Sequence, residues 1–141
     1  MNKYQGLADW FANNYTPLNG WIYFNSNTME DGSVSIIPLE SEKALNSFNS
    51  GAKEVQFLFA IAMIKDYSTE MSTINADAMA EADDFIEWIA EQNSLENFPD
   101  LGDNKVVSEV TALDSVPSTS VDPEQNVAKI QFNCSITFLE V

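Results

Sequence analysis

Histidine and arginine are both absent from the 141-residue sequence, and cysteine occurs only once. Without histidine the usual general base near neutral pH is missing, and without arginine so is the usual clamp for phosphate or carboxylate groups. A single cysteine excludes an internal disulfide, which agrees with a reducing compartment. These absences remove most enzyme templates, so we expect a protein that works by binding and not by catalysis.

Long apolar runs, internal repeats and low-complexity tracts are also missing, which argues against a membrane span, a solenoid or a disordered chain. The 141 residues, 45% of them apolar, are enough for one core that buries roughly 70% of the unfolded surface. The opening MNKYQGLADWF is unlike a secretory signal, because Asp9 interrupts a short apolar patch. We therefore expect a single domain over residues 1–141, made in the cytoplasm.

Acidic side chains dominate the charge of the chain. Aspartate and glutamate total 22 against six lysines, which gives a formal net charge of -16. Such a charge repels phosphate backbones and anionic lipid, so we expect no specific nucleic-acid binding and no membrane partner. Residues 66–103 hold eleven of the acids and no lysine. This segment indicates either a need for solubility or a surface that avoids DNA or meets a basic partner, and charge alone leaves both open.

Helical periodicity appears twice. Leu7, Trp10 and Phe11 follow the i, i+3, i+4 spacing ahead of Pro17, which predicts a short N-terminal helix. Over residues 72–92 the apolar positions recur at about 100° per residue, which predicts a longer amphipathic helix. Its polar side is a candidate DNA-repelling acidic face, made up of Asp77, Glu81, Asp84, Glu87 and Glu91.

Apolar runs with strand character complete the predicted fold. They cover residues 21–24, 34–39, 54–64, 105–113 and 130–138. The polar segments 40–53 and 114–126 are predicted as long loops. This order predicts an α+β fold, with a mostly antiparallel β-sheet of four to five strands and helices packed on one face.

Four apolar side chains are candidate interface residues: Phe48, Trp88, Val116 and Val121. Phe48 stands alone in a polar segment where nothing local would bury it. Val116 and Val121 belong to segment 114–126, and loops on a rigid sheet are a common place for recognition. Trp88 lies beside the apolar stripe of the long helix, where it either caps the edge of the core or anchors an interface.

Residues that could act in catalysis or bind a metal are explained more simply by structural roles. Cys134 alternates with apolar strand positions, which predicts a buried and inert thiol. Carboxylates of the long helix would suit an acid/base pair or a Mg²⁺ or Ca²⁺ site, but any amphipathic helix needs such a polar face. The stretch after Asp100 departs from a calcium loop, since Lys105 replaces its glycine and Thr111 its bidentate glutamate. We expect no catalytic residue, no cofactor and no metal.

Taken in order, several segments resemble the minor capsid or tail terminator (head-tail joining) proteins of long-tailed phages. The resembling segments are LADWF, SVSIIPLE, GAKEVQFLFAI, EADDFIEWIAEQN with the exit NFPDLGDNK, and AKIQFNCSITFLEV. They extend over nearly the whole chain, although residues 1–32 and 41–53 align less well. None of them is a chemical signature.

The resemblance implies a structural subunit of the virion. Such a subunit would form a ring with copies of itself, a homohexamer, at the head-proximal end of the tail tube. There it would contact the tail tube protein, stop tube polymerisation and dock to the head completion or connector protein. The family has no catalytic residues to transfer, so the resemblance assigns no site.

Two rival hypotheses remain open. An acidic DNA-mimic protein that inhibits a DNA-binding enzyme would also be small and negative, and its complex would weaken steeply with salt. An enzyme that uses only carboxylates and a metal is the third possibility, although the absence of histidine and arginine argues against it.

Overall fold

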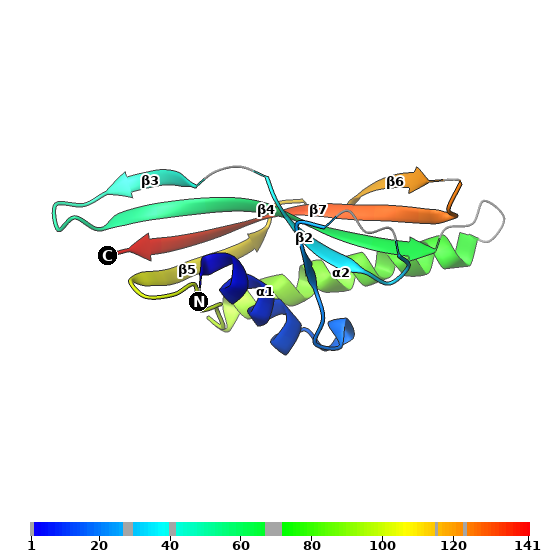
Figure 1. The fold of residues 1–141 in the computed structure, drawn as a ribbon, viewed down its shortest axis with the longest axis horizontal. Coiled ribbons are helices and arrows are strands. Elements are labelled where there is room, and N and C mark those ends of the chain that lie inside the picture. Colours follow the sequence, from blue (N-terminus) through cyan, green and yellow to red (C-terminus); the bar gives the residue numbers. More distant parts are fainter. Residues whose placement is uncertain (1, 27–29, 40–41, 67–71, 115, 123) are drawn as a thin grey trace.

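The structure is a computed structural model that describes residues 2–26, 30–39, 42–66, 72–114, 116–122 and 124–141. Two α-helices and one mostly antiparallel sheet give the α+β class that the sequence predicts (Figure 1). The elements in chain order are α1 (Lys3–Asn14), the 3-10 turn η1 (Thr16–Leu18), β1 (Tyr23–Phe24), β2 (Val34–Pro38), β3 (Lys43–Ser47), β4 (Lys53–Asp66), α2 (Ser72–Ser94), β5 (Lys105–Ala112), β6 (Ser118–Asp122) and β7 (Val127–Glu140).

Two long strands, β4 and β7, form the centre of the sheet. They pair antiparallel without a break, from Lys53 opposite Glu140 to Asp66 opposite Val127. Each strand has 14 residues, which corresponds to a ribbon roughly 45 Å long. β2 and β3 follow one another along the outer edge of β4, and β5 and β6 share the outer edge of β7. β1 pairs in parallel with β2.

In the described part of the chain the sheet has seven strands, so the prediction of four to five was too low. β3 and β6 lie within segments 40–53 and 114–126, which were wrongly predicted as loops throughout. Both strands are mostly polar and almost fully exposed, so no hydrophobic pattern marks them. They are strands because their backbones hydrogen-bond to a long neighbouring strand that is itself fixed by the core.

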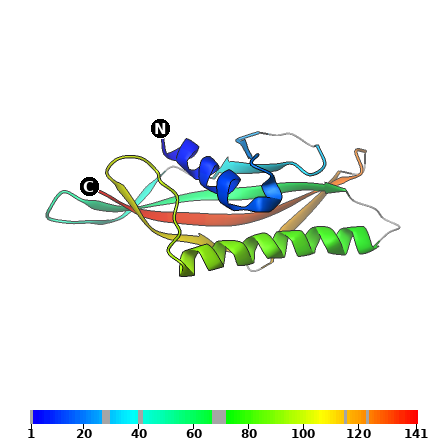
Figure 2. The ribbon, with the colours of Figure 1, turned by 90° about the horizontal axis from the view of Figure 1, so that it is seen from below.

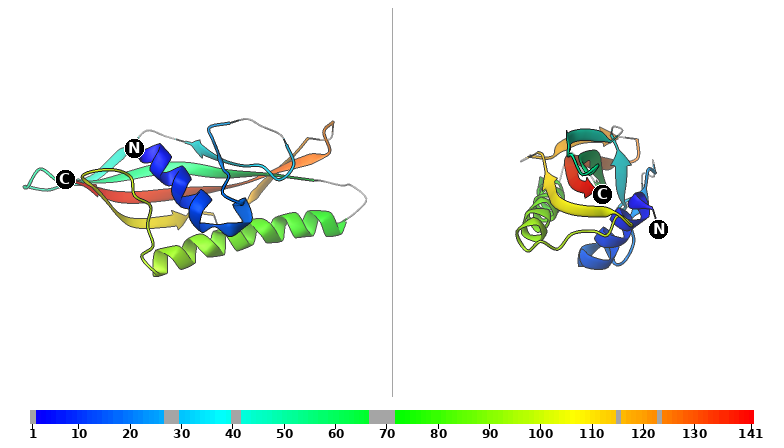
Figure 3. Two further views of the ribbon diagram at one scale, coloured as in Figure 1. Left: turned by 60° about the horizontal axis from the view of Figure 1, so that its bottom comes forward. Right: turned by 90° about the vertical axis from the view of Figure 1, so that its left-hand side faces the viewer.

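Both helices pack on the same face of the sheet, as predicted (Figures 2 and 3). α2 runs along the length of the sheet and α1 crosses it obliquely. The core between these layers contains five fully buried phenylalanines: Phe11 of α1, Phe85 of α2, Phe59 of β4, and Phe132 and Phe138 of β7. The ring of Phe85 lies 5.7 Å from that of Phe11 and 5.6 Å from that of Phe132, so it joins both helices to the sheet.

The docking of α1 depends on a glycine. Asn2 is the N-cap of α1, and its side chain accepts a hydrogen bond from the backbone N–H of Gln5 (2.9 Å). One turn into the helix, Gly6 is buried against the segment that follows α2, and a Cβ at this position would collide with the carbonyl oxygen of Asp100. The missing side chain lets the backbone of α1 lie directly on that segment.

Gly6→Ala should therefore lower the free energy of unfolding by about 1–3 kcal/mol, because overpacking at a backbone contact forces the helix away. Helix propensity alone predicts the opposite sign, since alanine is favoured over glycine by about 1 kcal/mol. Urea denaturation measures the difference. Asn13→Ala, at an exposed position of the same helix, should be neutral or slightly stabilising. A Gly6→Ala protein that is more stable than the wild type would contradict this account.

Candidate interaction surfaces

Strand β3 is an open edge of the sheet. In the described part of the chain its backbone pairs only with β4, and all of its side chains are exposed. Leu45 is 41% exposed, and Phe48, in the turn to β4, is 49% exposed. The prediction that nothing buries Phe48 is confirmed. Figure 1 shows this hairpin projecting at the end of the molecule that carries the C-terminus. An edge with exposed apolar side chains is a template for pairing with another chain.

Strand β6 is the second open edge, on the opposite side of the sheet. It pairs with the first half of β7, whereas β3 lies beside the end of β4 that faces the last residues of β7. The two edges therefore lie at opposite ends of the ribbon as well as on opposite sides. Val121 within β6 is 40% exposed, and Val116 just before it is 71% exposed. These two predicted interface candidates thus share one edge.

The remaining edges are partly covered or very short. Near the end of α2, the side-chain oxygen of Asn93 accepts a hydrogen bond from the backbone N–H of Val110 in β5 (3.1 Å). The helix thus occupies part of the outer edge of β5. β1 covers β2 and is itself only two residues long. Among the residues that the structure describes, β3 and β6 have no such cover, whereas β5, the last strand of the sheet, is covered in part.

The predicted acidic face of α2 is exposed to solvent along its whole length: Asp77, Glu81, Asp84, Glu87 and Glu91 are all exposed. Glu81 forms an ion pair with Lys65 of β4. Within the described residues, no lysine lies within ion-pair distance of the other four carboxylates. This face therefore has a large uncompensated negative charge.

Trp88 lies at the edge of the core. Its ring centroid is 5.1 Å from that of Trp10, 5.0 Å from that of Tyr15 and 6.0 Å from that of Phe85. The tryptophan is only half-buried and packs against the core cluster. Of the two interpretations of Trp88, the structure supports the one in which it caps the core, and it joins α1 to α2 through aromatic contacts.

A groove runs between α2 and the chain that lies beside it, and we call it the α2 groove. It consists of three adjoining cavities of about 250, 330 and 360 Å³, which share lining residues where they meet. Seven carboxylates and one lysine line it: Asp31, Asp66, Asp77, Glu81, Asp84, Glu87, Glu91 and Lys65. The acidic face of α2 is thus one wall of a groove.

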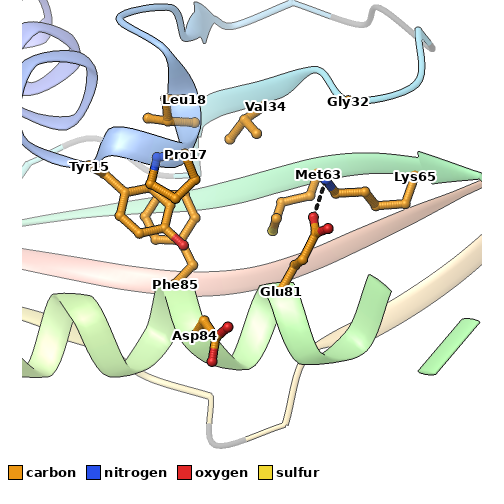
Figure 4. A pocket seen from close by; sticks show the side chains of 10 residues that line it. All are labelled: Tyr15, Pro17, Leu18, Gly32, Val34, Met63, Lys65, Glu81, Asp84 and Phe85. Carbon is orange, nitrogen blue, oxygen red and sulfur yellow. Dashed lines mark ion pairs between the residues drawn. The ribbon is translucent and has the colours of Figure 1, made fainter. Parts of the chain in front are cut away.

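The opposite wall and the floor of the α2 groove are largely apolar. Tyr15, Pro17 and Leu18 lie across from the helix, and Met63 and Phe85 lie below (Figure 4). Tyr15 is nine-tenths buried, and none of the described residues forms a hydrogen bond with its hydroxyl group. Sequence analysis missed Tyr15 and Lys65, because neither belongs to a motif. Only the tertiary fold brings them against α2.

Cys134 is fully buried, as predicted. Burial, together with the nearby charge of Asp114, raises the pKa of its thiol far above the ordinary value. In the described residues, no three side chains of the metal-binding types converge on one point. No described helix is both long enough and apolar enough to cross a membrane.

Comparison with known proteins assigns no family. No protein-family model matches the chain, and no curated protein sequence is significantly similar to it.

The burial of Cys134 predicts that thiol reagents label it only when the protein unfolds. In native buffer, labelling should be slower by orders of magnitude than in denaturant, because the thiol is both inaccessible and protonated. Labelling kinetics followed by mass spectrometry measure this difference. Rapid labelling of the folded protein would show that β7 opens locally.

The raised pKa of the Tyr15 phenol predicts that the protein loses stability in alkaline solution. Burial, and then the charges of Asp84 and Glu81, raise the pKa of its phenol above 10.0. The unfolded chain loses this proton first, so the stabilising contribution is complete below about pH 10 and is lost as the pH rises further. Urea denaturation from about pH 8 to about pH 11 should give a shallower pH dependence for Tyr15→Phe.

Asp84→Asn should also make this dependence shallower, because it removes a charge beside the phenol. Its neighbour Asp83 does not line the groove, so Asp83→Asn is the matched control. If Tyr15→Phe retained the full pH dependence, the loss of stability would have to come from other groups.

Proposed function

We propose that this protein is a structural subunit that assembles with copies of itself into a ring, as the tail terminator (head-tail joining) protein of a long-tailed phage. The observation that best supports self-assembly is that two edge strands, β3 and β6, lie open on opposite sides of one sheet. Each edge has exposed apolar side chains beside it, Leu45 and Phe48 on one and Val116 and Val121 on the other. Soluble proteins usually protect such edges.

The positions of the edges favour a head-to-tail contact. When the β3 edge of one copy meets the β6 edge of the next, two different surfaces pair, and the growing assembly keeps one unused β3 edge and one unused β6 edge at its ends. Such a heterologous contact adds one copy after another until the rotation between neighbouring copies closes a ring. Backbone hydrogen bonds would supply affinity, and Phe48 and Val121 would supply apolar contact area. The family resemblance adds the expected number of copies, six, and a location in the virion.

The expected partners of the ring are the tail tube protein on one side and the head completion or connector protein on the other. In such a ring, the acidic face of α2 would line or flank the passage for DNA. A wall that carries uncompensated carboxylates repels the phosphate backbone and lets it slide. This role does not need a catalytic residue, a cofactor or a metal.

Charged substitutions at the two edges test the ring. Phe48→Glu should block the β3 edge and Val121→Glu the β6 edge, because a charge on an edge strand opposes pairing. Both side chains are exposed, so the fold should tolerate the changes. We expect closed rings from the wild type and monomers from each variant alone. Native mass spectrometry and light scattering measure the copy number, in solution and on tail tubes.

Mixing the two variants makes the test sharper. Each variant retains the edge that the other lacks, so an equimolar mixture should form one-to-one heterodimers and nothing larger. Leu95→Glu, at a position 66% exposed directly after α2 and in neither edge strand, is the control and should assemble like the wild type. Dimers from a single variant would indicate a symmetric contact instead. A wild-type protein that stays monomeric both in solution and in the presence of tail tubes contradicts the proposal.

The row of carboxylates on α2 favours one alternative, an acidic DNA mimic. The exposed acids repeat at about one helical turn, and a basic DNA-binding surface would recognise such a row of charges. A mimic would stay monomeric or dimeric, and its complex with a DNA-binding enzyme would weaken steeply with salt. The copy number of the wild type therefore separates the two functions.

A further inference from the structure

The α2 groove combines a row of negative charges with an apolar floor. Along α2, Asp77, Glu81, Asp84 and Glu91 follow at steps of one or two helical turns, over roughly 20 Å of helix. Helix residues three or four positions apart have their Cβ atoms about 5–6 Å apart. Opposite them lie Tyr15 and other apolar groups. A ligand that fits both walls must be long, positively charged at intervals, and apolar between the charges.

Tyr15 indicates that the groove has a polar binding position within its apolar wall. Figure 4 shows its ring extending from the end of α1, with the hydroxyl directed at α2 on the side of Asp84. Most of the Tyr15 side chain is buried, but its hydroxyl reaches the groove. None of the described residues hydrogen-bonds to this hydroxyl, and the negative charges of Asp84 and Glu81 lie near it. An N–H donor placed between Tyr15 and Asp84 would satisfy both groups.

Lys65 shows which kind of group this environment accepts. Its side chain, an ammonium on an aliphatic stem, enters the groove from β4 beside Met63 and pairs with Glu81 (Figure 4). The stem lies on the apolar side and the charge meets the carboxylate. Among the described carboxylates of the groove, only Glu81 forms an ion pair. Farther along the helix Asp84, Glu87 and Glu91 line the groove without a lysine.

We propose that the α2 groove binds a linear polyamine. Its ammonium groups would pair with Asp84, Glu87 and Glu91, and one of them would donate a hydrogen bond to the hydroxyl of Tyr15. The methylene segments would lie against Pro17 and Trp88, which line the same stretch of the groove. Ammonium groups also bind favourably over the faces of tyrosine and tryptophan rings.

Other classes of ligand fit less well. The described residues hold no cluster of three metal-binding side chains, because the carboxylates are spread along a helix instead of surrounding one point. An anion would meet seven carboxylates. A peptide backbone would find no open strand in the groove to pair with. This inference depends only on the groove and is independent of the proposed ring.

The probe for the test is spermidine, and the readouts are isothermal titration calorimetry and thermal unfolding. Spermidine should raise the unfolding temperature of the wild type in a saturable manner, as expected for a ligand that binds the folded state. Asp84→Asn should weaken binding roughly tenfold, because it removes a charge-assisted hydrogen bond. Tyr15→Phe, which keeps the ring, should weaken it about fivefold.

Matched controls separate a site from general screening of charge. Asp83→Asn makes the same chemical change one residue away and outside the groove, so its affinity for spermidine should equal that of the wild type. Butylamine, with one ammonium group, should bind far more weakly at the same ammonium concentration. The proposal is overturned if Mg²⁺ at equal ionic strength stabilises as much as spermidine, if butylamine matches it, or if Asp83→Asn and Asp84→Asn lose affinity equally.

Discussion

The unbroken pairing of β4 with β7 is the interaction on which the rest of the fold depends. It runs from Lys53 opposite Glu140 to Asp66 opposite Val127, and every other strand except β1 is attached directly to one of these two. One face of the ribbon supplies the sheet side of the core, against which α1 and α2 pack. Because the ribbon is longer than any single neighbouring strand, two short strands share each of its outer edges. This arrangement leaves β3 and β6 as the outermost strands where they lie.

The same arrangement separates two kinds of surface. Edges of the sheet offer backbone groups and a few apolar side chains, which suit a protein partner. The face of α2 beside η1 offers carboxylates above aromatic rings, which suit a cation. Self-assembly and cation binding would therefore use different elements. Asn93, near the end of α2, joins the helix layer to the sheet by its hydrogen bond to β5 and touches neither proposed assembly edge.

Sequence patterns predicted the structure correctly wherever burial of one face gives the sequence a regular spacing of apolar residues. The alternation in 130–138 correctly placed Cys134 in the core, and the helical period correctly placed Asp84 on the exposed face of α2. Patterns failed where the backbone alone decides, as in the polar strands β3 and β6. They also failed at a bulge: strict alternation puts Val106 on the inner face of β5, but the register shift after Val107 leaves Val106 exposed and buries Val107 instead. The α2 groove could not be predicted, because its walls come from four distant segments.

The separation of β4 and β7 along the chain has a consequence for how the protein folds. Val55 of β4 pairs with Phe138 of β7, so the central contact of the sheet closes a loop of most of the chain. Proteins dominated by such distant contacts fold slowly, because the entropy of closing the loop is lost before the contacts form. During synthesis, β4 emerges with its apolar residues long before β7 exists. Until then β4 can pair only with β2 and β3, which are already synthesised, and the edge that β7 will occupy stays open. Protection of that edge from aggregation depends on early packing against α1 or on a chaperone.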